Sequence, residues 1–225
     1  MKKLLISAVL STTFFIAFTQ ECTTQWPYLF SDFSQGTVYF KSGKTDSKFL
    51  NIYVLGSNLH FIEGENIVEL KSISNIAKVE LFKETFLPFE GKFYQILDED
   101  RGGYLALLTT GDLRALQENA GAYGTSSNTS STKNLSSIEL DIGRSILTGN
   151  TSHIDLRNNR DMGKKIPLLK KYFFITGGSV IPAKAKEVEN ILPDAAKQRA
   201  FKTFVKANKI NWNKPEDLVK VLALF

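Results

Sequence analysis

Between residues 36 and 70, the chain alternates short apolar runs with turn sequences that contain Gly, Ser or Asn. Within a run, apolar and polar residues alternate with a period of two, which is the pattern of a strand with one buried face. The runs span residues 37–41, 49–55, 59–62 and 67–70. The pattern predicts three or four short antiparallel strands joined by tight turns.

The run at 49–55 differs from its neighbours because it is apolar on both faces. One face carries Leu50, Ile52 and Val54, and the other carries Phe49, Tyr53 and Leu55. A strand of this kind is covered on both sides. We therefore expect this strand to belong to the core, and we expect functional residues to lie on loops or on the C-terminal helices.

Strand-like runs continue as far as residue 181. Residues 76–82 form one such run, and two later hairpins are predicted where a pair of glycines separates apolar segments. These pairs are Gly102-Gly103 and Gly177-Gly178. The β-rich part of the chain therefore reaches well beyond the first meander.

From residue 182 onward, the apolar period changes to that of helices. Pro182 is predicted to begin the first helix, because its missing N–H costs nothing at that position. Asp194 is predicted to cap a second helix, and Asn208 to end it in the left-handed conformation. Asn213 and Glu216 resemble a capping box for a third helix. That helix would bury residues that recur at i, i+3, i+4 and i+7, namely Leu218, Val221, Leu222 and Phe225.

These elements predict an α+β fold, in which an antiparallel β-meander forms a sandwich or partly open barrel and C-terminal helices pack against it. The sequence divides into a signal peptide at 1–19, an antiparallel β body at 20–118 and a Ser/Thr/Asn-rich loop at 119–137. Residues 138–181 would complete the β body. Residues 182–225 form a basic helical segment.

The first nineteen residues have the pattern of a secretory signal peptide. Lys2 and Lys3 precede an apolar run at 4–18, and Ala17 and Thr19 provide the small residues of a cleavage site. Cleavage before residue 20 would place the chain in the periplasm or at the outer membrane, with no membrane-spanning segment left. The alternative is an uncleaved anchor, although the run is short for a transmembrane helix.

Cys22 is the only cysteine, so no internal disulfide is possible. A bacterial lipoprotein has a small residue directly before the modified cysteine, and Glu21 occupies that place here. We therefore expect a free thiol near a mobile terminus. Pairing with another molecule is the alternative.

Charge is distributed unevenly along the chain. Residues 20–159 carry 12 Lys+Arg and 17 Asp+Glu, whereas residues 160–225 carry 14 Lys+Arg and 6 Asp+Glu. The candidate binding residues in this basic segment are Lys197, Lys202, Lys206, Lys170 and Lys171. Alternatively, these lysines form only the solvated face of amphipathic helices. The expected partner is an envelope protein, a glycan or an anionic lipid surface, and not nucleic acid, because the chain is predicted to be secreted.

The sequence offers few candidates for catalysis or for metal binding. Its two histidines are His60, in a predicted strand, and His153, in a predicted polar loop at 153–165, and we interpret them as structural and solvated, respectively. No Gly-x-Ser-x-Gly, His-Glu-x-x-His or paired-Cys pattern occurs. The acidic hairpin tip at 98–101 lacks the spacing of a calcium loop. We therefore predict no cofactor and no metal site.

Several short motifs, taken in order, resemble a known family. They are Gly-Thr-Val-Tyr-Phe-Lys at 36–41, Leu-Asn at 50–51, Lys-Phe-Tyr-Gln at 92–95, Ala-Tyr-Gly-Thr-Ser-Ser at 122–127, the run at 201–212 and Pro-Glu-Asp-Leu at 215–218. Together they resemble a family of uncharacterised secreted proteins of Bacteroidota. That family has no known activity, so the resemblance implies an envelope location and assigns no functional residue.

The sequence therefore favours a non-catalytic secreted or periplasmic protein that binds an unknown ligand or partner. Two alternatives stay open. One is a glycan or peptide hydrolase that uses a pair of carboxylates, since 23 acidic residues allow many pairings. The other is a β-barrel that binds a lipid in an apolar cavity.

Overall fold

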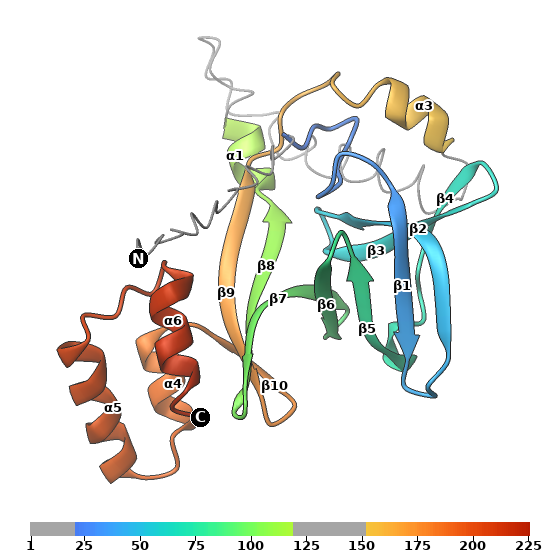
Figure 1. Ribbon diagram of the computed structural model, residues 1–225. Coiled ribbons are helices and arrows are strands. Elements are labelled where there is room, and N and C mark those ends of the chain that lie inside the picture. Colours follow the sequence, from blue (N-terminus) through green and yellow to red (C-terminus); the bar gives the residue numbers. More distant parts are fainter. Residues whose placement is uncertain (1–20, 119–151) are drawn as a thin grey trace, which may run out of the picture.

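The computed structural model describes residues 21–118 and 152–225. The predicted signal peptide, the predicted Ser/Thr/Asn-rich loop and the start of the segment predicted at 138–181 lie outside these residues. In the described part, ten strands form one antiparallel sheet, and helices follow at the C-terminal end (Figure 1). The sheet is curled into an open half-barrel and the helices pack against its extension, so the α+β prediction is confirmed.

The strands follow the order β10-β9-β8-β7-β6-β5-β1-β2-β3-β4 in the sheet. Two meanders, β1 to β4 and β5 to β10, are therefore joined where β1 pairs with β5. The predicted turns at 42–43 and 177–178 connect β1 to β2 and β9 to β10. The strand bounds are β1 Ser34–Phe40, β2 Thr45–Tyr53, β3 Asn58–Glu63, β4 Asn66–Glu69, β5 Ile76–Leu81, β6 Glu84–Phe89, β7 Lys92–Asp100, β8 Gly103–Gly111, β9 Leu168–Thr176 and β10 Ser179–Pro182.

The turn between β2 and β3 holds the curl together. The backbone N–H of Phe93 donates to the Ser57 carbonyl at 2.9 Å, and that of Gly111 donates to the Val54 carbonyl at 2.9 Å. The Ser57 hydroxyl also donates to the Thr109 carbonyl at 3.1 Å. These bonds join the β2–β3 turn, near one end of the strand order, to β7 and β8 in its other half. The first six strands therefore curl into a half-barrel lobe, and β8 to β10 extend away from it (Figure 1).

Apolar side chains fill the inside of the curl. The cluster consists of Val38, Leu50, Ile52, Leu59, Phe61, Ile76, Val79, Leu81, Phe86 and Phe93. The prediction that both faces of the 49–55 run are covered is confirmed for Leu50 and for Ile52 to Val54. It is wrong for Phe49, which is 55% exposed, because the segment that covers the outer face packs against only the second half of β2.

That covering segment precedes β1. Asn51 is fully buried and anchors it: the side-chain amide donates to the carbonyls of Phe30 and Asp32 at 2.9 Å, and its oxygen accepts from the Phe30 N–H at 3.1 Å. Trp26 and Tyr28 are likewise buried. The outer face of the half-barrel is thus sealed by aromatic rings and by a buried polar anchor whose hydrogen bonds are satisfied.

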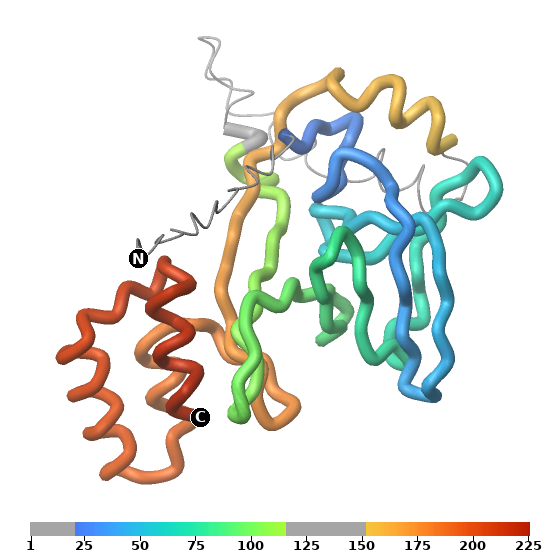
Figure 2. Tube along the Cα trace, in the orientation of Figure 1, coloured from blue at the N-terminus to red at the C-terminus, as the bar shows by residue number. Residues whose placement is uncertain are grey.

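Three helices, α4 (Ala185–Ile191), α5 (Ala195–Ala207) and α6 (Pro215–Leu222), form a second lobe. α4 and α6 lie nearest to the extended strands, and α5 is outermost (Figure 1). Their core joins Leu105 of β8 and Phe174 of β9 to residues of all three helices. The predicted inward face of α6 is confirmed for Leu218, Val221 and Leu222, which are buried, whereas Phe225 lies beyond the end of the helix and is half-buried. The end of the chain lies beside the tips of the β7–β8 and β9–β10 hairpins (Figure 2).

Two predicted helix boundaries agree only in part with the structure. Pro182 does not begin a helix: it is the last residue of β10, an edge strand, where a residue without an N–H is tolerated. α4 begins three residues later, at Ala185. The predicted cap of α5 is confirmed, because the Asp194 carboxylate accepts from the Lys197 N–H at 2.7 Å.

The ends of α5 and α6 also differ from the prediction. Asn208 has a right-handed φ of −89°, and the left-handed residue is Lys209, with a φ of +49°. Asn213 does not cap α6, so the capping box is wrong. Lys214 occupies the cap position in an extended conformation, which the following Pro215 favours.

Two short helices border the undescribed segment. α1 (Leu113–Glu118) was not predicted, although Asp112 caps it by accepting from the Arg114 and Ala115 N–H groups at 3.1 Å. α3 (His153–Asn158) replaces the start of the loop predicted at 153–165. Ser152 accepts from the Asp155 N–H at 3.4 Å and so provides the cap that starts α3. A short 3-10 helix, η1 (Ile73–Asn75), precedes β5.

Candidate binding groove

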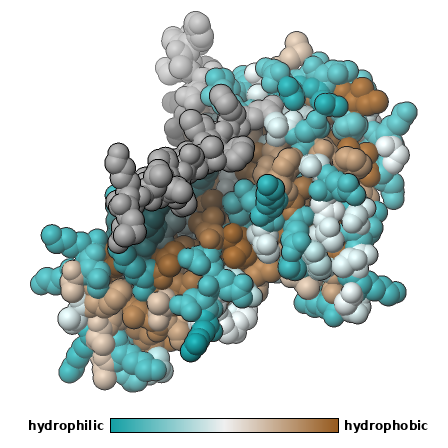
Figure 3. All heavy atoms as spheres, viewed as in Figure 1, coloured by the Kyte–Doolittle hydropathy of each residue, from teal (hydrophilic) through white to brown (hydrophobic). Residues whose placement is uncertain are grey.

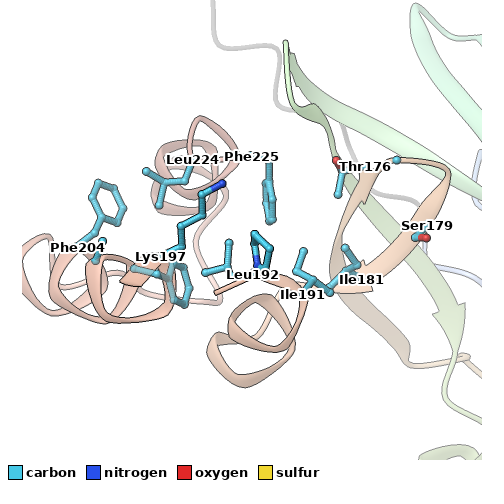
Figure 4. Close-up of a pocket in the computed structure, with 13 residues that line it drawn as sticks. Thr176, Ser179, Ile181, Ile191, Leu192, Lys197, Phe204, Leu224 and Phe225 are labelled. Carbon is cyan, nitrogen blue, oxygen red and sulfur yellow. The ribbon is translucent and has the colours of Figure 1, made fainter. Parts of the chain in front are cut away.

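A groove of about 750 Å³ lies in the helical lobe, between α5, the α4–α5 junction, the β9–β10 hairpin and the end of the chain (Figure 4). Its volume is in the range of sites that hold one small ligand. Its lining residues are Thr176, Gly177, Ser179, Ile181, Ile191, Leu192, Pro193, Lys197, Ala200, Phe201, Phe204, Leu224 and Phe225.

The local sequence explains why the groove stays open. α4 has only seven residues and ends before Pro193, and Asp194 then caps α5 in a new direction. α5 is attached to the lobe mainly through Phe201, its buried residue, while Phe204 is half-buried. One side of α5 therefore stands away from the β9–β10 hairpin, and a space is left between them.

The walls of the groove expose apolar side chains to solvent. Ile191 is 42% exposed and Leu224 is 44% exposed. The space-filling view shows apolar atoms on the surface of the helical lobe, among hydrophilic side chains (Figure 3). A concave apolar surface rimmed by polar residues is typical of ligand sites.

Lys197 is the one charged side chain in the lining. It projects from the first turn of α5 across the groove, and its ammonium lies toward Leu224 and Phe225 (Figure 4). Among the described residues, no carboxylate lies within ion-pair distance of this ammonium. Lys202 differs, because its ammonium binds the Glu189 carboxylate at 2.8 Å.

The other candidate lysines lie outside the groove lining. Lys206 is exposed in the last turn of α5. Lys170 and Lys171 are exposed in the first half of β9, and consecutive strand residues point to opposite faces of a sheet. A binding role for these three lysines, and for Lys202, stays a prediction, and Lys197 is the candidate that the structure places in a cavity.

The chain was compared with family models, curated proteins and solved structures. No family model, curated protein or solved structure matches the chain. The resemblance to secreted Bacteroidota proteins therefore stays a prediction, as does secretion. In the ranges 21–118 and 152–225, no helix is long and apolar enough to cross a membrane.

The two histidines occupy different environments. His60 is 2% exposed, its Nδ1 is hydrogen-bonded to the Tyr28 hydroxyl at 3.0 Å, and its ring stacks on Tyr53 at 4.8 Å. Burial lowers its pKa to about 4. The structural interpretation of His60 is therefore confirmed. His153 is half-buried at the start of α3 and contacts Phe33 edge-to-face, so it is not the solvated loop residue that was predicted.

Cys22 is buried and lies well inside the structure. It is 1% exposed, packs with Val54 and Ile166, and donates its S–H to the Tyr28 carbonyl at 2.9 Å. The expectation of a mobile terminal thiol is therefore wrong, although the thiol is free. Burial raises its pKa to about 11, which keeps the thiol protonated and unreactive at neutral pH.

The groove and the half-barrel interior show no site for either alternative function. The groove lining contains no Asp or Glu side chain. Glu80, whose pKa is lowered by hydrogen bonds from Lys78 and Tyr39, lies on the surface of β5. Within the described residues, no group of three or more His, Cys, Asp or Glu could hold a metal ion. The inside of the half-barrel, where a lipid-binding barrel would hold its ligand, is filled by packed side chains.

The sequence indicated most groove residues only as packing residues of helices. Ile191 is the last residue of α4 and is 42% exposed. Ile181 was indicated only as a strand residue and Leu224 carried no signal, since the groove joins segments that are distant in sequence. The useful hint was an apolar Ile191-Leu192 pair directly before a helix-breaking proline.

Proposed function

We propose that this chain is a non-catalytic, secreted and envelope-associated binding protein, and that the groove in its helical lobe holds the ligand. The observation that carries the proposal is a concave apolar surface with exposed Ile191 and Leu224 on its walls. The apolar run at 4–18 supports secretion. The free protein leaves these apolar walls exposed to water, and their burial by a ligand provides the driving force for binding.

The expected affinity is moderate. Each buried methylene contributes about 0.8 kcal/mol, but association and ordering costs offset much of this gain. Ligands of about 20 heavy atoms reach roughly −0.3 kcal/mol per atom, or about −6 kcal/mol. This value corresponds to a dissociation constant of about tens of micromolar.

A fluorescent apolar probe tests the proposal. We would titrate the purified chain with neutral N-phenyl-1-naphthylamine and compare two variants of α5. Ala200→Phe places a ring in the groove from an exposed position, and Ala207→Phe makes the same change on the same helix outside the lining. We expect Ala200→Phe to weaken probe binding at least fivefold and Ala207→Phe to leave it unchanged. Equal binding by both variants, or no binding by the unmodified chain, would refute the groove as the ligand site.

A further inference from the structure

We infer that the groove takes a single-chain amphiphile with an anionic head group, a long-chain carboxylate, and that Lys197 binds this head group. The inference rests on the proposed function, because it names the ligand class of the same groove. It depends on two features of the helical lobe, namely the unpaired ammonium of Lys197 and the lack of charge on the other side chains that line the groove.

Lys197 is the lysine that lines the groove, and, unlike Lys202 and Lys220, it has no ionic partner among the described residues. Lys202 binds Glu189 at 2.8 Å, and Lys220 binds Asp217 at 2.6 Å. Among the described residues, no acidic group lies within ion-pair distance of Lys197, and its ammonium projects across a groove whose other lining side chains carry no charge (Figure 4). An unpaired cation on the wall of an apolar groove favours an anionic ligand group.

The position of Lys197 in α5 adds to the positive potential. The first turn of a helix carries partial positive charge from its free N–H groups, and cations there are unfavourable. The first turn of α5 contains no acidic residue, whereas that of α6 contains Glu216 and Asp217. Asp194 precedes the helix, and its carboxylate caps the Lys197 N–H. Asp194 already places one negative charge at this helix end, and a ligand anion beside the Lys197 ammonium would add a second charge of the sign that a helix N-terminus favours.

The rest of the lining suits a hydrocarbon chain. Beyond Lys197, the lining side chains are apolar except for the hydroxyls of Thr176 and Ser179 at the hairpin end (Figure 4). A sugar or a zwitterion would leave polar groups unpaired against such walls, which costs free energy. A carboxylate with one alkyl chain places its charge at Lys197 and its methylenes along the apolar walls. The volume of about 750 Å³ suits one ligand of this size.

Two ligands of equal chain length, one with an anionic head group and one with a neutral head group, test whether the groove prefers the anion. Decanoate and decanol have the same chain length, and each can displace the naphthylamine probe from the full chain at pH 8. We expect the chain to bind decanoate about fivefold more tightly than decanol, and higher salt to reduce this preference.

Three variants assign that preference to one side chain. In Lys197→Gln, we expect decanoate affinity to fall about fivefold while decanol affinity stays the same, and Lys197→Arg should restore the preference. Lys186→Gln removes an exposed lysine of α4 outside the lining and should behave as the unmodified chain. Thermal melting would confirm that all three variants are folded.

The possible outcomes separate the two proposals. If Ala200→Phe blocks the probe but decanoate and decanol bind equally, the groove is a site for neutral apolar ligands and the inference is wrong. An unchanged preference in Lys197→Gln also overturns it. If the probe does not bind, or if the groove is occluded by a second copy in sedimentation experiments, both proposals fail.

Discussion

Acid should destabilise this protein through one buried histidine. His60 is 2% exposed in the half-barrel lobe, and its neutral ring is hydrogen-bonded to Tyr28 and stacked on Tyr53. Burial lowers the pKa of His60 from 6.5 to about 4, because the imidazolium would lose its hydration without gaining a counter-ion. Protonation therefore favours the unfolded chain.

The sign and size follow from proton linkage. Above pH 6.5, neither state binds the proton and the free energy of unfolding does not depend on this group. Between pH 6.5 and about 4, only the unfolded state binds it, so stability falls by up to ~1.4 kcal/mol per pH unit. The total loss is about 3 kcal/mol, which is a large part of the 5–15 kcal/mol typical of folded domains.

Urea unfolding at pH 7, 6, 5 and 4 would measure this loss. The fluorescence of Trp26 reports the same lobe, since its ring lies 5.3 Å from that of Tyr28. His60→Asn keeps an acceptor near the Nδ1 position but cannot take up the proton in this range. We expect the variant to be less stable at pH 7, because it loses the stacked ring, and to lose about 3 kcal/mol less than the unmodified chain by pH 4.

The comparison between variants removes contributions from other groups. Glu84, for example, has a pKa raised by burial and acts in the opposite direction, but it is present in both proteins. Parallel stability curves for His60→Asn and the unmodified chain would show that the burial argument is incorrect.

Three further predictions concern the packing of the described residues. Cys22 should react with iodoacetamide only when the chain unfolds, because its thiol is buried with a pKa of about 11; rapid labelling of the native protein at pH 8 would contradict this. Asn51→Ala should cost roughly 2–4 kcal/mol in urea unfolding, since buried backbone groups lose their partners, whereas the exposed Asn159→Ala should cost under ~1 kcal/mol. Gly103→Ala should cost about 3 kcal/mol or more in stability, because its added carbon would collide with the neighbouring strand β9. The added carbon of Gly177→Ala meets only open space, so this variant should lose about 1 kcal/mol from its positive φ alone. Similar melting temperatures for the two variants would refute the collision.

Local patterns in the sequence predicted the sheet well. The period of two and the paired glycines located the β1–β2, β7–β8 and β9–β10 hairpins, because each depends on neighbouring residues. The structural role of His60 also followed from its place in a predicted strand, although its full burial did not. The pairing of β1 with β5 could not be predicted in this way, because it depends on which strand edges meet after both meanders have formed.

Helix ends and the groove were harder to predict because they depend on competition between neighbouring groups. Asn213 has a good capping side chain, but Pro215 favours an extended residue directly before it and moves the cap to Lys214. Ile191 belongs to an apolar stripe, but α4 ends there and no later segment covers it fully. A helical period tells which residues share a face and gives no information on what packs against that face.

The two lobes have different relations to solvent, although they share one sheet. β7 contributes Phe93 to the half-barrel core, and β8 and β9 contribute Leu105 and Phe174 to the helical core. The half-barrel fills its interior with packed side chains and is sealed by the segment that Asn51 anchors. The helical lobe leaves apolar walls exposed beside an unpaired cation. Folding of the helical lobe does not require exposed apolar walls or an unpaired Lys197 ammonium. A ligand that covers these walls and pairs with Lys197 would therefore stabilise the folded chain beyond what its own packing provides.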